Sequence, residues 1–480
     1  MFKKLLALAL FAAAPAQAAV FTTGIAGAGQ PFSNYQPSLV LNQRVQTQGI
    51  FPCRDCGYGA GATIGMVRSF GFNFGVDPAQ GQLLPIVQNT ALFSILGTTY
   101  GGNGQTTFAL PDLAGRVAIG AGTAPGLGTY DLGGQYGTAD VTLTAANMPA
   151  HAHGLPGGGV TTTAGGSQPF DNMQPSLGLN YLVQVEGIFP PRSGPVGLGG
   201  GIEPEPGFVA GSSYIGQVAL FSGNFEPGWM IADGRLLSIS QYTALFAIIG
   251  TTYGGDGQTT FALPDLRGRA IVGAGQGPGL ANVSLGETLG EPTETLTPQE
   301  MAAHDHDLAG SGMTDPAGGG QPFSQYQAGL GLNYLVALQG VFPNRDNWNF
   351  AEETYLGEII PFAGNFAPRG YAFAQGQLLS IAQNQALFAL FGTQFGGNGQ
   401  TTFALPDLRG RVMMGAGNNF VVGEQYGTAT TTLSEANLPP HAHDYVVANG
   451  VPEPATWALL VLGFGLIGGA LRRRAAPSLA

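Results

Sequence analysis

Hydrophobic and polar positions recur along this chain in two patterns, and each pattern occurs three times. The first pattern opens with a short apolar run of strand length, which starts at Ile64, Ile215 and Leu356. The second contains an alternating apolar segment, such as LNYLV at residues 332–336, which is typical of a well-buried strand. We therefore expect a short strand to open each copy of the first pattern and a long buried strand in each copy of the second.

Each copy of the first pattern also contains a helix-like segment. In the third copy, residues 378–391 read LLSIAQNQALFALF, and their apolar positions roughly follow helical spacing. Ser380 is placed to cap the N-terminus of this helix, and Gly392 is placed to end it. One helix and several short strands per copy, joined by long glycine-rich loops, predict an α+β fold.

The most regular stretch follows the helix and reads GTQFGGNGQTTFALPDLRGR in its third copy, at residues 392–411. The other copies lie at residues 97–116 and 250–269, so the repeat is far longer than the roughly 20–50 residues of a solenoid and indicates three domains. We expect the loop glycines to adopt positive φ, with Asn398 tolerating the same region. Without a following lysine, such a loop is typical of a turn rather than of a phosphate-binding site.

The second pattern, a QPF-type module, is offset from the first. Its copies begin at Gln30, Gln168 and Gln321, so one precedes the first unit and none follows the third. We expect the opening module to complete the last unit and close the three units into an internal pseudo-trimer. The expected division is a signal peptide at 1–18, a module at 19–63, unit 1 at 64–155, a module and linker at 156–202, unit 2 at 203–310, a module at 311–350, unit 3 at 351–446 and a sorting segment at 451–474.

Composition narrows the range of partners. The 480 residues are 44% hydrophobic and only 10% charged, with 79 glycines and a net charge of −12. Lys3 and Lys4 are the only lysines. An acidic chain without clustered lysine and arginine repels phosphate backbones, so we expect no nucleic-acid partner. The excess of acidic over basic residues fits an extracellular protein, or one that attracts cations.

Both ends carry targeting features. Residues 1–18 combine a basic start, an apolar run and an Ala-x-Ala site, which is typical of a signal peptide. At the other end, a Pro-Glu-Pro motif precedes an apolar run at residues 455–471, which is at the lower limit for a membrane span, and then an arginine cluster that should stay cytoplasmic. An ordinary C-terminal anchor is the alternative to a sorting signal. The residues of this signal are Pro452, Glu453, Pro454, Arg472, Arg473 and Arg474.

The candidate chemistry lies in the histidines, all of which form His-x-His pairs. On an extended segment, residues i and i+2 point to the same side, so each pair can offer two imidazoles to one point. Three converging pairs would make a six-nitrogen site for a transition metal such as Zn or Fe. The alternative is a set of solvent-exposed turns without a ligand. The candidate ligands are His151, His153, His304, His306, His441 and His443.

Other features argue against catalysis. Closure by six ligands leaves no open position for a substrate, and the sequence contains no nucleophile elbow, HExxH motif or Walker loop, so we expect no enzyme activity. Cys53 and Cys56 are predicted to form a small local disulfide, because an exported protein matures in an oxidising compartment. A redox role for the two cysteines would need a βαβ context that the glycine-rich residues 57–61 do not suggest.

The block that runs from the Ile/Leu-Gly start through GTTYGGxGQTTFALPDLRGR to the His-x-His pairs resembles the phage tail collar family. With the QPF-type module, it is most similar to the microcystin-dependent protein group of that family. The resemblance covers roughly residues 25–445 and implies a small, irregular α+β domain of short tail fibres, in which three chains assemble and their histidine pairs meet at a metal. Ala114 departs from the pattern, since the other copies have Arg267 and Arg409.

The C-terminal segment resembles the PEP-CTERM sorting signal. This resemblance implies export across the inner membrane of a Gram-negative bacterium, anchoring by the C-terminal helix before processing, and an exosortase-type protease as partner. The signal often accompanies exopolysaccharide production.

Together these features predict an exported, non-enzymatic protein of the cell surface or extracellular matrix, either a binding or a structural module associated with exopolysaccharide or biofilm. It would be a monomeric pseudo-trimer or a homotrimer. The aromatic loop residues Tyr100, Tyr253 and Phe395 could stack on an extracellular glycan, with buried packing as the alternative. The alternative functions are a structural component of a phage-tail-like assembly and a metal-dependent hydrolase.

Overall fold

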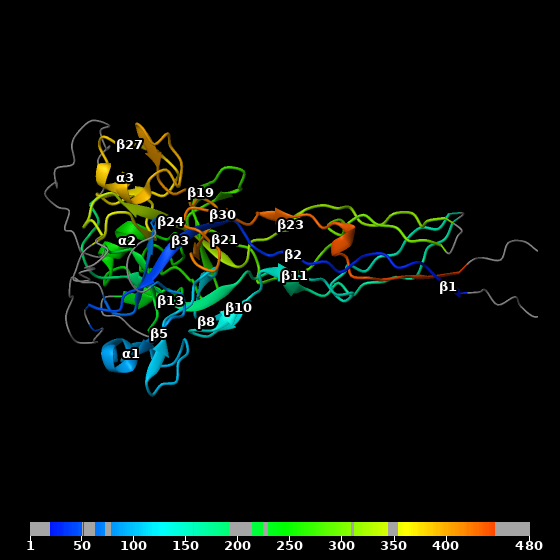
Figure 1. Cartoon of the computed structure of the whole chain (residues 1–480), viewed down its shortest axis with the longest axis horizontal. Coiled ribbons are helices and arrows are strands. Elements are labelled where there is room, and N and C mark those ends of the chain that lie inside the picture. Colours follow the sequence, from blue (N-terminus) through cyan, green and yellow to red (C-terminus); the bar gives the residue numbers. More distant parts are fainter. Residues whose placement is uncertain are drawn as a thin grey trace, which may run out of the picture.

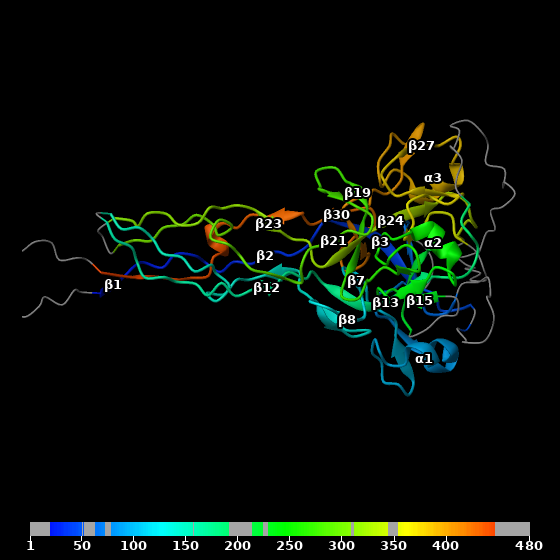
Figure 2. The same cartoon turned by 180° about the vertical axis from the view of Figure 1, so that it is seen from behind.

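The computed structural model describes residues 20–49, 51, 63–72, 78–156, 158–191, 214–223, 229–308, 312–343 and 354–446. These residues form a broad head and one long, narrow needle that extends from it (Figures 1 and 2). The head contains the described residues outside the needle. The needle is built from the described residues of 20–34, 139–172, 292–325 and 429–446.

Three long strands, in which every residue is buried, form the framework of the head. The expected strand at residues 332–336 is confirmed, because it lies inside one of them. Each long strand pairs in an antiparallel manner with the strand that opens the following unit, and these opening strands begin two or three residues later than the apolar runs that predicted them. The pairs are β3 (Ser38–Val45) with β4 (Met66–Phe70), β13 (Ser176–Gln184) with β14 (Val218–Phe221), and β24 (Gly329–Ala337) with β25 (Glu358–Phe362).

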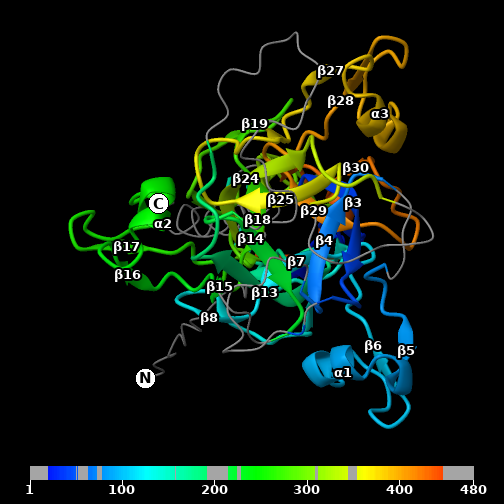
Figure 3. The ribbon, with the colours of Figure 1, turned by 90° about the vertical axis from the view of Figure 1, so that its left-hand side faces the viewer.

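Each long strand also pairs in parallel with a strand of the preceding unit. These pairs are β13 with β7 (Val117–Gly120), β24 with β18 (Ala270–Gly273), and β3 with β29 (Val412–Gly415). Since β29 belongs to unit 3 and β3 to the opening module, the units close into a ring around one axis, as the offset of the modules predicts. Figure 3 shows the three units around this axis.

Shorter strands complete the sheet, which has fourteen strands within the described residues. Two strands, β15 (Trp229–Ile231) and β26 (Tyr371–Phe373), pair with β13 and β24. Three more pair with the beginnings of the long strands: β10 (Gln135–Tyr136), β21 (Thr288–Leu289) and β30 (Gln425–Tyr426). Two small hairpins lie beside the sheet, β8 (Gly122–Ala124) with β9 (Gly128–Tyr130) and β19 (Gly275–Gln276) with β20 (Asn282–Val283).

Each unit projects a lobe from the ring, made of one two-stranded sheet and one helix (Figure 3). Unit 1 has β5 (Leu83–Pro85), β6 (Thr107–Ala109), the short 3-10 helix Ile86–Gln88 and α1 (Thr90–Leu96). Unit 2 has β16 (Leu236–Ser238), β17 (Thr260–Ala262) and α2 (Thr243–Ile249). Unit 3 has β27 (Leu378–Ser380), β28 (Thr402–Ala404) and α3 (Gln385–Phe391).

The α+β prediction is wrong, because the described residues are mostly β and carry three helices of seven residues each. The predicted helix at residues 378–391 is half its expected length. Its first residues form β27 instead, because they pair with β28, a partner that local spacing does not reveal. Gly392 ends α3 with φ of 56°, as expected. In the described part of the chain, no helix is long and apolar enough to cross a membrane.

The repeated loop agrees with its prediction in the glycines but not at Asn398. Gly396, Gly397 and Gly399 have positive φ, as expected. Asn398 is not among the residues with positive φ. Its side-chain oxygen instead accepts hydrogen bonds of 2.9 to 3.0 Å from the N–H groups of the three residues Gln400, Thr401 and Thr402.

The needle consists of three extended arms held together at intervals. Near the head, one short strand pair joins each module to a unit: β2 (Phe32–Ser33) with β11 (Asp140–Val141), β12 (Phe170–Asp171) with β22 (Thr293–Glu294), and β23 (Phe323–Ser324) with β31 (Thr430–Thr431). A 3-10 helix, Glu435–Asn437, follows β31. At the far end, β1 (Val20–Thr22) pairs with β32 (Asp444–Val446).

A trefoil of aromatic rings fills the axis where the needle meets the head. Phe32, Phe170 and Phe323 come from the three modules, and each pair of ring centroids is 5.8 Å apart with an edge-on angle of 84° to 90°. Edge-on aromatic pairs add about 0.5–1.5 kcal/mol beyond the burial of their area. This trefoil therefore ties the three modules to one another at the base of the needle.

The three seams between neighbouring units differ in chemistry. At the seam between units 3 and 1, Arg68 donates from Nε to Glu358 over 2.7 Å and makes a second contact through Nη2. The Glu358 side chain is buried and that of Arg68 is only 14% exposed, and Arg68 also lies over the ring of Tyr355, at 4.9 Å. The equivalent positions at the other seams carry no charge: Met66 and Ala219 at one, Gln217 and Ile360 at the other.

Candidate metal centre

The six histidines meet on the axis of the needle and are all buried. Their segments are extended, and His151 exchanges two main-chain hydrogen bonds of 2.9 Å with Ala164. His304 pairs with Ala317, and His441 with Ala26, in the same way. Neighbouring imidazole rings have centroids between 4.7 and 5.4 Å apart. The predicted convergence of the three pairs is therefore present in the geometry, which also contradicts the alternative of solvent-exposed turns.

Each imidazole is oriented by a hydrogen bond at its Nδ1 atom. The Nδ1 atom of every histidine lies within hydrogen-bond distance of a main-chain carbonyl oxygen, which can only accept, so Nδ1 carries the proton. In the neutral ring this leaves Nε2 unprotonated and free to bind a metal, and such outer bonds fix the orientation of metal ligands. The acceptors are Pro149 for His151 (2.9 Å), Ala302 for His304 (3.0 Å), Pro439 for His441 (2.9 Å), Asp315 for His153 (2.9 Å), Gly24 for His306 (2.8 Å) and Thr162 for His443 (2.7 Å).

The Nε2 atoms share one small space. Nε2 of His304 lies 3.2 Å from Nε2 of His151 and 3.0 Å from that of His441. In the described residues, Nε2 of the other three, His153, His306 and His443, is buried without a hydrogen-bond partner. The ligand atoms of all but His443 lie within 4.8 Å of one another. Two unprotonated nitrogens cannot hydrogen-bond to each other, so a cation is the group that would satisfy this set.

Burial keeps five of these histidines neutral. Burial, together with the neighbouring imidazoles, lowers the pKa of His151 and His441 to about 4 and that of His304 to about 3. Burial also lowers the pKa of His153 and His443. At neutral pH these five imidazoles are therefore in the form that binds metal ions.

The spacing of the nitrogens fits a six-coordinate ion. With metal–nitrogen bonds of about 2.1 Å, adjacent ligands of an octahedron are about 3.0 Å apart and opposite ones about 4.2 Å. The observed separations of 3.0 to 3.2 Å, within an overall limit of 4.8 Å, are close to these values. Six imidazoles suit iron or nickel better than zinc, which takes four ligands in structural sites.

Three threonines that the sequence interpretation missed support the second histidine of each pair. Thr161, Thr314 and Thr23 are buried, and their hydroxyl oxygens accept the main-chain N–H of His153, His306 and His443 at 2.9 to 3.0 Å. Two of them follow their histidine by eight residues, a spacing that occurs in both copies and could have drawn attention to them. The third lies in the opening module, 420 residues before its histidine, so a linear search would not find it.

The other predicted site residues do not join this centre. The two tyrosines bond to a neighbouring unit instead: Tyr100 donates to the carbonyl of Ser222 (2.9 Å), and Tyr253 donates to that of Ala363 (2.7 Å). Phe395 packs on Phe391 within its own unit. All three side chains are half-buried against the core of the head. Several predicted residues lie outside the described residues, namely Cys53, Cys56, Pro452, Glu453, Pro454, Arg472, Arg473 and Arg474.

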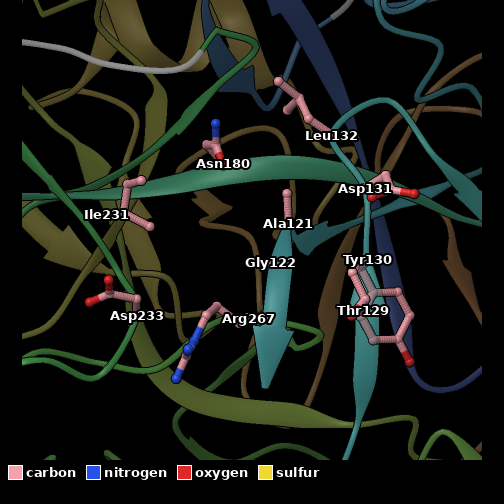
Figure 4. Close-up of a pocket in the computed structure, with 10 residues that line it drawn as sticks. All are labelled: Ala121, Gly122, Thr129, Tyr130, Asp131, Leu132, Asn180, Ile231, Asp233 and Arg267. Atoms are coloured by element: carbon pink, nitrogen blue, oxygen red, sulfur yellow. The ribbon is translucent and has the colours of Figure 1, made fainter. Parts of the chain in front are cut away.

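A separate pocket of about 370 Å³ lies in the head at the seam between units 1 and 2 (Figure 4). Two of its three charged groups have partners, since Arg267 binds Asp265 and Asp233 binds Arg235 through paired hydrogen bonds, while Asp131 is exposed. Asn180, on the long strand β13, donates to a main-chain carbonyl. The pocket therefore offers a polar surface in which the arginine and one carboxylate are already paired.

Two known family models match stretches of the chain. The Phage Tail Collar Domain matches residues 65–118, 216–271 and 357–413. The PEP-CTERM protein-sorting motif matches residues 450–474. No curated protein and no solved structure matches the chain. All six histidines lie outside the matched ranges. Three stretches of the chain therefore match the phage tail collar domain, and one C-terminal stretch matches the PEP-CTERM protein-sorting motif.

Proposed function

We propose that this protein is an exported, non-enzymatic structural or binding module of the cell surface or extracellular matrix, and that a six-coordinate transition metal locks its needle. Tail collar domains are structural units, and the sorting motif implies export, a membrane-anchored tail and processing by an exosortase-type system. An association with exopolysaccharide or biofilm rests on the sorting motif alone, because the two tyrosines that could have stacked on sugars bond to a neighbouring unit.

The observation that carries this proposal is the ligand set itself. Three arms contribute two buried imidazoles each, and all six Nδ1 atoms are tied to main-chain carbonyls. A metal held by all six nitrogens has no position left for a substrate, which supports a structural role over a hydrolytic one. The metal would cross-link three segments that are distant in the sequence, and such binding free energy adds directly to stability.

The test is metal content together with oligomeric state, measured by native mass spectrometry on the purified exported protein. We expect one iron or nickel ion per monomer. The variant with His304→Ala and His306→Ala should lose this ion, while Asp305→Ala, which changes the residue between them, should keep it. A folded monomer without metal would remove the locking role, and metal found only in a trimer would show that separate chains supply the ligands.

The three collar domains also favour a second candidate, a structural component of a phage-tail-like assembly. The two candidates differ in what they require, because an assembly component must bind other subunits of the tail. Recovery of the protein in high-molecular-weight particles that sediment with tail-like structures would favour this candidate. Recovery as a single chain at the cell surface would favour the first.

A further inference from the structure

Both ends of the described chain meet at the end of the needle that is farthest from the head (Figure 1). Strand β1 pairs with β32 in antiparallel register, with Val20 opposite Val446 and Phe21 opposite Tyr445. The rings of Phe21 and Tyr445 stack at 5.7 Å, and the hydroxyl of Thr22 donates to Asp444 over 2.7 Å. The chain therefore leaves the body at this end, and not from the head.

The sorting motif begins very close to this point. Its match starts at residue 450, four residues beyond Val446. Even a fully extended segment of four residues spans at most about 14 Å. Since the motif implies a membrane-anchored tail, the far end of the needle is held near the membrane for as long as the tail is attached.

The side chains at this end differ from those on the rest of the needle. We define the needle tip as residues 20–25, the described residues of 153–162 and 306–314, and 443–446. In the described part of the needle, large hydrophobic side chains are exposed only at the tip, and their exposed fractions run from 44% at Phe21 to 76% at Ile25. The residues are Val20, Phe21, Ile25, Val160, Met313 and Val446.

The charges at the tip limit the surface that it can meet. Its charged side chains are all carboxylates: Asp307 and Asp444 are exposed, and no lysine or arginine lies in the tip. Carboxylates are repelled by anionic lipid headgroups. Apolar residues at a membrane interface gain free energy from the area that they bury. The tip therefore suits a zwitterionic lipid surface better than an anionic one.

We propose that the needle tip is a docking surface for the lipid bilayer, so that the protein stands on its needle with the head pointing away from the membrane. The lipid contact is made by the exposed apolar side chains of the tip, next to the point where the sorting segment enters the bilayer. This inference depends on the position of the sorting motif and on the needle, and it does not require the histidines to bind a metal.

The test places one tryptophan at either end of the full-length protein, reconstituted in vesicles through its own tail. The native Trp229, Trp348 and Trp457 are first changed to phenylalanine. Val160→Trp then reports from the tip, and Leu236→Trp reports from a lobe of the head. The two sites are matched, because their native side chains are 69% and 61% exposed. Quenching by brominated phosphatidylcholine measures contact with the acyl chains, and circular dichroism checks that both variants are folded.

We expect several-fold stronger quenching at the tip than at the head, and weaker quenching at the tip when anionic lipid replaces part of the phosphatidylcholine. Equal quenching at both sites would overturn the proposal. Protection of the tip tryptophan only when an exosortase-type protease is present, without lipid quenching, would show that the tip meets a protein and would also overturn it. Metal content can be measured on the same samples, so failure of the lipid contact is distinguishable from failure of the metal site.

Discussion

At the histidines, one nitrogen of each ring is held and the other is left free. The Nδ1 bonds to main-chain carbonyls fix both the tautomer and the direction of every Nε2 lone pair. Such bonds reduce the rearrangement that metal binding requires, because the ligands are already oriented. The same arrangement leaves the metal-free needle with lone pairs that face each other at 3.0 to 3.2 Å. We therefore expect the metal to be a large part of the stability of the needle.

The threonine hydroxyls should matter to the metal although they do not touch it. Thr161→Val keeps the shape of the side chain but removes the acceptor of the His153 N–H, which is buried. Changes of this kind beside a metal ligand cost about 10–100-fold in affinity. Competition with a chelator measures this loss, and Thr161→Ser, which keeps the hydroxyl, should restore most of the affinity. Equal affinities for the valine and serine variants would contradict a positioning role.

The lowered pKa values predict how the metal-free protein responds to pH. The unfolded histidines titrate near 6.5, while the pKa of His151 and His441 is about 4 in the folded state. Between these values the unfolded state binds more protons, so the free energy of unfolding falls as the pH drops from about 6.5 to about 4. Urea unfolding of the metal-free protein at several pH values measures this dependence. A variant with His151→Ala and His441→Ala should show a weaker dependence.

The chemistry of single residues was partly predictable from the sequence. The His-x-His spacing predicted that both rings of a pair face one side, because alternation along an extended segment is a local property. The tethering of the second histidine of each pair was not predictable, since its acceptor comes from another arm: His306 bonds to Gly24, and His153 bonds to Asp315. Such partners are set by the packing of the three arms, which spacing within one arm does not describe.

Among the elements, the phenylalanine trefoil is the clearest test of how the needle is joined to the head. Phe170→Ala removes one of three rings that contact each other in pairs, and the loss of a buried phenylalanine costs about 3–5 kcal/mol. The midpoint of urea unfolding should fall accordingly. Leu236→Ala serves as the control, because its exposed side chain should change stability by less than about 0.5 kcal/mol. Equal effects of the two changes would contradict a structural role for the trefoil.

Element boundaries followed the local pattern only where no distant partner intervened. The end of α3 was predicted, because Gly392 adopts the positive φ that helix termination favours. The start of the helix was missed, because residues 378–380 pair with β28 across the lobe. The long strands were predicted, since their apolar sequence needs burial on both faces. The predicted fold class was wrong because short apolar segments without clear alternation, such as residues 378–380, were assigned to helices.

At the scale of the whole molecule, the ion pair at the seam between units 3 and 1 should contribute to closure of the ring. Arg68→Ala leaves the Glu358 carboxylate buried without its partner, and breaking such a pair costs about 3–5 kcal/mol. Adding Glu358→Gln should recover most of this loss, because it produces an uncharged seam like the other two. Urea unfolding of the two variants measures the difference. A double variant as unstable as the single one would contradict this account.

Closure itself was predictable at this scale, because the order of modules and units in the sequence left the third unit without a following module. Strand β3 supplies the missing partner through its parallel register with β29. The needle could not be foreseen, because its arms are extended segments with short strands whose partners lie more than a hundred residues away, as for β2 and β11.

The uneven seams have a consequence for how such a protein can diverge. In a ring of three identical chains, every substitution appears at all three seams. Three copies of unit 1 would place Met66 opposite Arg68 at every seam, and no seam would carry the glutamate that Glu358 supplies here. Here three copies share one gene, and each can change without altering its neighbours. A charge can therefore be introduced on one side of a single seam and paired with an opposite charge on the other side. The same freedom extends to the three lobes, which can each acquire a different surface while the shared core keeps them in place.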